Sequence, residues 1–190
     1  AASSKQQPAA ASRQQQQPQQ PAAAGSKQAG RSDETATNEA QLPPSADRAT
    51  DAGVAPKKLE GRCECDGTRW ELAAGTPMGP MIACHCSQCN RSSSHIVAAV
   101  NVAEIGLSWT RTDHIIWYAS SDFAERGFCG RCGSQMAWRQ SDPVIRKGTS
   151  LMVGSFDDKD ILTLERHIYV AHKAPYYDIT DDLPQYPHSD

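Results

Sequence analysis

The sequence has 190 residues, of which 19 are Lys or Arg and 22 are Asp or Glu, so its formal net charge is −3. A domain that binds nucleic acid normally presents a dense basic face, and this balance argues against nucleic acid as a partner. No stretch of the sequence is long and apolar enough to span a bilayer, so we expect a protein without a membrane span.

The first part of the chain, residues 1–58, consists mostly of Ala, Gln, Pro and Ser, with glutamine runs at 14–17 and 19–20. Such a composition cannot bury an apolar core. We therefore expect a low-complexity arm that tethers the rest of the chain, with protein partners ordering residues 1–58. Its Ser- and Ala-rich start also resembles the end of an organelle transit peptide.

The second part, residues 59–190, carries every cysteine and every aromatic residue and is long enough for one domain. Turn signals such as Asp66-Gly67 and Asp142-Pro143 separate short segments, and no long helical period is present. We expect an all-β domain of small antiparallel sheets. Segments rich in β-branched and aromatic residues predict strands at 68–72, 95–102, 105–109, 114–119, 125–128, 135–138, 151–153 and 167–170.

Seven cysteines fall into three groups along this domain, at positions 63 and 65, at 84, 86 and 89, and at 129 and 132. Disulfides are the alternative use of these thiols. An odd number leaves at least one thiol over, and neighbours as close as Cys63 and Cys65 are poorly placed to bridge. We therefore expect metal-bound thiolates, with zinc favoured over iron. Reduced cysteines indicate a reducing intracellular compartment, either the cytosol or the mitochondrial matrix.

One metal site is expected to join Cys63, Cys65, Cys129 and Cys132. If Cys-x-Cys lies on a strand, both side chains point to one face, and the Cys-x-x-Cys pair closes a tight knuckle in which Gly130 and Gly133 permit positive φ. Four thiolates leave no coordination position for a substrate. This site is therefore expected to be structural.

The other three cysteines, Cys84, Cys86 and Cys89, lack a fourth partner. An open position is typical of a catalytic zinc, and three thiolates suit a soft incoming ligand such as a thiol, whose pKa the metal would lower. The ring of His85 is expected to point away from its two neighbouring cysteines. Four further histidines stay open as the fourth ligand: His95, His114, His167 and His172.

The order of these motifs resembles the glutathione-dependent formaldehyde-activating enzyme family, which includes centromere protein V. The similarity spans residues 60–187 and is carried by Gly61-Arg62-Cys63-Glu64-Cys65, Cys84-His85-Cys86-Ser87-Gln88-Cys89-Asn90-Arg91, Phe128-Cys129-Gly130-Arg131-Cys132-Gly133-Ser134, His172-Lys173-Ala174-Pro175 and Asp182-Leu183-Pro184. The resemblance implies the Mss4-like β-tent fold, a structural zinc at the four cysteines and a second zinc at Cys84, Cys86 and Cys89 that accepts the glutathione sulfur. It also implies a carbon–sulfur lyase that forms S-hydroxymethylglutathione from glutathione and formaldehyde.

Three positions depart from the family pattern. Asn90 stands where an arginine is usual, which leaves Arg91 as the anion contact beside the second site, Asp66 separates Cys65 from Gly67, and Tyr176 stands where tryptophan is frequent. The missing arginine favours a second hypothesis besides the enzyme. In that hypothesis the domain is a non-catalytic, zinc-stapled accessory subunit, tethered by its arm to a larger assembly that could be mitochondrial.

Overall fold

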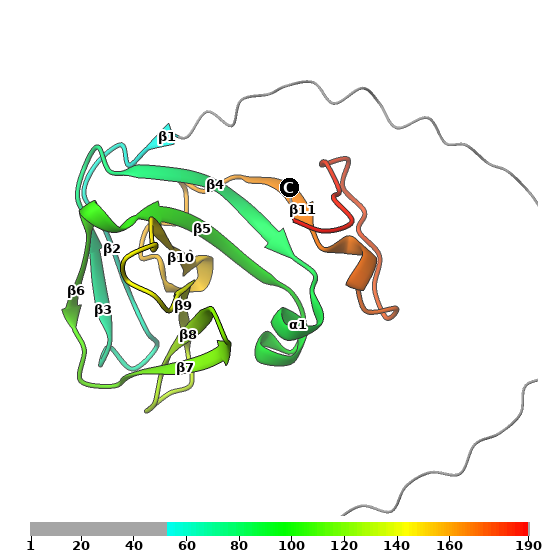
Figure 1. Ribbon diagram of the computed structural model, residues 1–190. Helices are drawn as coiled ribbons and strands as arrows, with labels where there is room; N and C mark the ends of the chain where they lie inside the picture. The colour runs from blue at the N-terminus through cyan, green and yellow to red at the C-terminus, as the bar shows by residue number, and fades with distance from the viewer. Residues whose placement is uncertain (1–52, 190) are drawn as a thin grey trace, which may run out of the picture. The chain divides into compact units, whose positions relative to one another are not determined.

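A computed structural model describes residues 53–189 (Figure 1). The predicted low-complexity arm, with the partners expected for it, lies outside the described residues except for residues 53–58. Within residues 53–189, no helix has the length and apolar character needed to cross a membrane.

The larger sheet has eight strands: seven follow the order β1-β4-β5-β10-β9-β8-β7, and the eighth, β11, also pairs with β4 (Figure 1). All of its pairings are antiparallel except that of β11 with β4, which is parallel. The strands span Gly53–Val54 (β1), Pro77–Cys84 (β4), Val97–Ala103 (β5), Ile115–Ser121 (β7), Ala124–Cys129 (β8), Gln135–Gln140 (β9), Gly148–Met152 (β10) and Leu164–Ile168 (β11).

The smaller sheet is antiparallel and has the order β2-β3-β6, with strands Leu59–Arg62, Arg69–Leu72 and Leu107–Arg111. Helix α1, Ser87–Ser93, lies between β4 and β5 in the chain. Three single 3-10 turns complete the described structure: η1 (Glu104–Gly106), η2 (Val153–Ser155) and η3 (Val170–His172).

The two sheets share one apolar core. Trp70 of β3 and Phe156, which follows η2, are both buried and pack edge to face with their ring centroids 4.6 Å apart. The indole Nε1–H of Trp70 donates to Ser155 Oγ at 3.0 Å, so the buried polar group is satisfied. Around this pair the core continues into both sheets through Leu59, Leu72, Val100, Val102, Met136 and Leu151.

The prediction of an all-β domain built from antiparallel sheets is confirmed, and each of the eight predicted strands overlaps an observed one. Five features differ. Strands β1 and β2 were not predicted. Strand β4 was not predicted either, because Pro77, Gly79 and Pro80 indicate a turn; the register shift between Met78 and Met81 accommodates them. The short helix α1 and the parallel pairing of β11 were also not expected.

We predict that Phe156→Ala lowers the free energy of unfolding by about 3–5 kcal/mol, because it leaves a cavity against Trp70. Urea titration followed by tryptophan fluorescence measures the change. Phe123→Ala removes the same ring from a side chain that is 63% exposed and should cost less than about 0.5 kcal/mol. Equal losses in the two variants would contradict this assignment of the core.

Candidate metal centres

The first cysteine cluster joins the two sheets. Its four sulfurs, from Cys63, Cys65, Cys129 and Cys132, all lie within 4.8 Å of one another. Sγ of Cys65 is 3.6 Å from Sγ of Cys63 and 3.6 Å from Sγ of Cys129. Four sulfurs held tetrahedrally at zinc–sulfur distances of about 2.3 Å would lie about 3.8 Å apart. The spacing therefore fits a zinc ion.

Cys63 and Cys65 lie in the turn after β2 rather than on a strand, so the expected strand geometry is wrong. The turn is closed by the Asp66 amide, which donates to the Cys63 carbonyl at 3.1 Å, and Asp66 has a positive φ of 65°. The Asp66 carboxylate accepts from Arg69 and Arg111. These ion pairs hold a non-glycine residue in the left-handed conformation that the turn needs.

Cys129 ends β8, and Cys132 lies in the turn that follows. Gly133 has the expected positive φ of 77°, and its amide donates to the Cys129 carbonyl at 2.8 Å. Gly130 does not have a positive φ. It is needed for space, because a Cβ there would lie 2.4 Å from Cδ1 of Ile116.

The thiols of the first cluster have unequal acidity. Hydrogen bonds from the Ser134 side chain and amide lower the pKa of Cys132 to about 5. The Gly67 amide lowers the pKa of Cys65, but burial and the neighbouring thiols outweigh it and raise the value to about 12. A metal ion bound here would displace the thiol protons, so that all four sulfurs would bind it as thiolates.

The second cluster brings together Sγ of Cys84, Cys86 and Cys89 within 4.8 Å of one another. Cys84 ends β4, Cys86 is the N-cap of α1, and the Cys89 amide donates to the Cys86 sulfur at 3.4 Å. Hydrogen bonds from the Cys84 and Cys89 thiols lower the pKa of Cys86 to about 2. The capping turn thus holds the three sulfurs around one point.

A cation that the sequence did not reveal lies beside this cluster. Arg126, on β8, has its Nη2 3.8 Å and its Nη1 3.9 Å from Sγ of Cys89, and Nη2 is 3.4 Å from Oε1 of Gln88. Arg126 stands 37 residues after Cys89 in the chain. Only the pairing of β8 within the sheet brings it here, so no local motif could have identified it.

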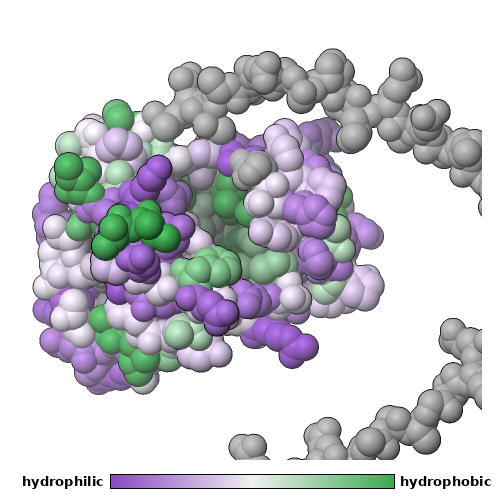
Figure 2. Space-filling view, in the orientation of Figure 1, coloured by the Kyte–Doolittle hydropathy of each residue, from purple (hydrophilic) through white to green (hydrophobic). Residues whose placement is uncertain are grey.

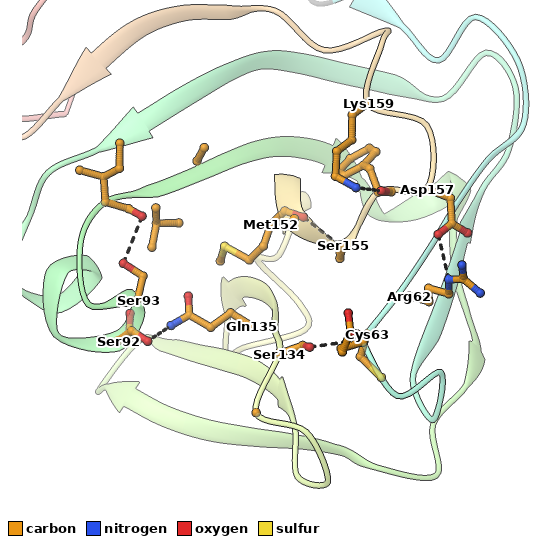
Figure 3. A pocket seen from close by; sticks show the side chains of 17 residues that line it. Arg62, Cys63, Ser92, Ser93, Ser134, Gln135, Met152, Ser155, Asp157 and Lys159 are labelled. Atoms are coloured by element: carbon orange, nitrogen blue, oxygen red, sulfur yellow. Dashed lines mark hydrogen bonds and ion pairs between the residues drawn. The ribbon is translucent and has the colours of Figure 1, made fainter.

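Two cavities flank α1. The smaller, of about 450 Å³, is lined by both Arg91, the predicted anion contact, and Arg126. The larger, of about 820 Å³, extends from Ser92 and Ser93 of α1 to Cys63 of the first cluster (Figure 3). Gln135 and Met152 line both cavities, and the Gln135 side-chain amide donates to the Ser92 carbonyl. Figure 2, in the orientation of Figure 1, shows groups of hydrophobic residues among hydrophilic ones on the face turned toward the viewer.

The buried histidines, His85 and His167, contact each other and other side chains rather than the cysteine clusters. Within residues 53–189, the groups able to hold a metal ion consist of cysteines. His85 is only 2% exposed, and its ring nitrogens lie 2.6 Å from the Tyr177 hydroxyl and 2.8 Å from Nδ1 of His167. Nε2 of His167 is 3.0 Å from the Asp181 carboxylate. Burial lowers the pKa of His85, so its ring is neutral at neutral pH.

Comparisons with known proteins show one matching protein family and one similar solved structure. The family model described as "Glutathione-dependent formaldehyde-activating enzyme" matches residues 58–172, which is more than half of the chain. A solved structure of a Rhodobacter sphaeroides protein is similar over 52% of this chain and 87% of its own, with 20% identity and a TM-score of 0.41. No curated protein gives a significant match.

We predict that Gly133→Ala destabilises the domain by about 1–2 kcal/mol, because an L side chain at this positive φ is strained. Thermal unfolding of the metal-loaded protein measures the loss. Gly154→Ala is the matched control, since a Cβ at either position meets no atom within 4 Å but only Gly133 of the two has a positive φ. A similar loss in the control would show that the backbone conformation is not the cause.

Proposed function

Because this chain belongs to the glutathione-dependent formaldehyde-activating enzyme family, we propose that it is a carbon–sulfur lyase that joins glutathione, or a similar small thiol, to formaldehyde. The proposal rests on the different number of sulfurs in the two cysteine clusters. Four sulfurs meet in one cluster and three in the other, so the second cluster keeps a coordination position for a thiol.

In this proposal, Cys63, Cys65, Cys129 and Cys132 hold a structural zinc ion, while Cys84, Cys86 and Cys89 hold a second zinc ion. A zinc ion in the three-sulfur cluster would lower the pKa of a thiol in its remaining coordination position. The donor sets support this assignment, because soft thiolates select zinc over magnesium or calcium.

Two arginines give the smaller cavity the charge that a thiol such as glutathione requires. Glutathione carries two carboxylates, and guanidinium groups bind carboxylates through paired N–H donors. Arg91 and Arg126 line this cavity together, and Arg126 also reaches Cys89. A cation from β8 therefore offsets the arginine that position 90 lacks, which weakens the case for an accessory subunit.

The proposed reaction is the addition of a thiol to a carbonyl group. The thiol sulfur attacks the carbonyl carbon of formaldehyde, a carbon–sulfur bond forms, and the π electron pair of the carbonyl moves to its oxygen. That oxygen takes a proton while the thiol loses one, so thiol and aldehyde combine without an oxidant or reductant. The arginines hold the anionic thiol so that its sulfur meets the aldehyde in one orientation.

We predict two zinc ions per chain by metal analysis. Cys84→Ala should release one ion and leave the domain folded, because that cluster lies within a single stretch of the chain. Cys129→Ala should unfold the domain, because the first cluster joins two sheets. Circular dichroism of both variants distinguishes these results. Equal loss of secondary structure in the two variants would mean that both ions are structural.

We also predict that the chain accelerates exchange between glutathione, formaldehyde and their adduct, measured by NMR exchange spectroscopy. Arg126→Gln should raise the KM for glutathione about tenfold, since a charged hydrogen bond to a carboxylate is lost. Arg111→Gln is the control: it removes an exposed arginine that pairs with Asp66 and should leave KM unchanged. A wild-type chain that gives no acceleration over buffer would reject the enzyme and favour the accessory subunit.

A further inference from the structure

Strand β10 ends before the two strands that flank it. Its last residue, Met152, pairs with Ala99 of β5, although β5 begins at Val97. On its other side, the pairing of β10 with β9 reaches only Ala137, although β9 begins at Gln135. The first residues of β5 and β9 therefore lie beyond the end of the strand that separates them, and a gap remains there.

The chain that leaves β10 is held elsewhere. After the turn η2, the side chain of Phe156 is buried in the core, and Phe156 forms an isolated bridge with Gly61 of β2. The Asp157 amide donates to the Glu60 carbonyl at 3.0 Å. Extending β10 into the gap would break these contacts, so the gap is a fixed part of the fold.

The larger cavity, of about 820 Å³, occupies this gap (Figure 3). Its lining includes residues 96–98 at the start of β5, residues 133–135 at the start of β9, and Met152 and Gly154, where β10 is followed by η2. Neighbouring strands lie about 4.8 Å apart, so β5 and β9, with β10 between them, are about 10 Å apart where the gap begins. This is the width that one extended chain needs, and the volume is typical of a ligand pocket.

On one side of the gap, the backbone of Ala98 faces the cavity. Alternate residues of a strand direct their N–H and C=O groups to opposite neighbours. The Glu104 amide, just after β5, donates to the Lys147 carbonyl, just before β10, and β5 pairs with β10 without a register shift. Ala98 precedes Glu104 by an even number of residues, so its N–H and C=O groups point to the same side.

On the other side of the gap, the backbone of Gln135 faces the cavity. The Cys129 amide of β8 donates to the Ser134 carbonyl at 2.9 Å, so the next residue, Gln135, directs its N–H and C=O groups away from β8 and into the gap. Among residues 53–189, the amides of Ala98 and Gln135 have no hydrogen-bond acceptor. A ligand with amide groups of its own would satisfy both.

The charges around the cavity favour an uncharged ligand. Two cations, Arg62 and Lys159, line it together with two anions, Glu64 and Asp157. Nε of Arg62 is 3.1 Å from Oδ1 of Asp157, and Nζ of Lys159 donates to the Phe156 carbonyl at 2.6 Å. Because both signs are present in equal number, the cavity offers no excess charge to a phosphate or to a cation.

We propose that the larger cavity binds an extended, uncharged peptide segment, which lies between β5 and β9 and forms backbone hydrogen bonds with Ala98 on one side and Gln135 on the other. The segment takes the place that a longer β10 would fill, as a strand added to a sheet. The contact extends over about three residues, or about 10 Å of extended chain. The proposal is independent of the proposed function, because the peptide needs no thiol and both arginines assigned to glutathione line the smaller cavity.

The test titrates the isotope-labelled, zinc-loaded full chain with the blocked peptide acetyl-Thr-Val-Thr-Val-Thr-amide and follows the titration by NMR. The amide signals of Ala98, Gln135 and Gly154 should shift, and hydrogen exchange of the Ala98 and Gln135 amides should slow when the peptide is bound. The same peptide with both valines N-methylated should bind about tenfold more weakly, because it lacks two of the N–H donors that pair with a strand.

Gly154→Leu fills the cavity from the protein side, because Gly154 lines it and a Cβ there meets no atom within 4 Å. This variant should lose the peptide-induced shifts. Gly53→Leu is the matched control: it adds the same side chain at an exposed glycine that does not line the cavity, and it should bind the peptide as the wild-type chain does. Circular dichroism verifies both variants. Should Gly154→Leu fail to fold, the comparison of the two peptides on the wild-type chain decides.

Unshifted Ala98 and Gln135 signals at millimolar peptide would overturn the proposal, as would equal binding of the methylated peptide. Shifts confined to β7, the last strand in the order of the larger sheet, would mean that the peptide adds to that edge instead and would also overturn it. Displacement of the bound peptide by glutathione would assign the larger cavity to the thiol, with the same consequence. Absence of catalytic exchange, which would reject the proposed function, leaves these binding results unaffected.

Discussion

The rest of the structure depends on the four-sulfur cluster, because it is the point where a turn of the smaller sheet meets a turn of the larger one. Cys65 and Cys129 are 64 residues apart in the chain, and closing so long a loop is entropically costly. The buried contact of Trp70 with Phe156 opposes the same cost through apolar packing. Strand β8 ends in Cys129 and also carries Arg126, so the strand that reaches the four-sulfur cluster also places a cation beside the three-sulfur cluster.

Local patterns were sufficient for much of this fold. Segments rich in β-branched and aromatic residues predict most of the strands, and cysteine spacing predicts which sulfurs meet. What sequence reasoning missed depends on distant parts of the chain. Strand β4 contains Pro77 and Pro80, yet it is stabilised by neighbours on both sides, β5 and β11. The contacts of Arg126 with Cys89 and of His167 with His85 require the folded sheet, since no repeat or spacing relates these positions.

The departures from the family pattern are easier to understand once their surroundings are known. Asn90 and Tyr176 differ from the usual residues at positions far apart in the sequence, and the structure places them in one hydrogen bond. A tryptophan at 176 would offer no oxygen to accept from Asn90. Asp66 likewise has a role, because its carboxylate gathers Arg62, Arg69 and Arg111 around the turn of the first cluster. At these positions a hydrogen bond and a set of ion pairs, made by the residues that are present, stabilise the local structure.

The parallel pairing of β11 with β4 has a consequence for how the molecule assembles as it is synthesised. Every cysteine has emerged by residue 132, whereas the groups that satisfy the ring of His85 come from residues 167 and 177. The sulfurs can therefore gather a metal ion before the last strand is made. Addition of β11 beside β4 then completes the surroundings in which His85 and His167 are buried.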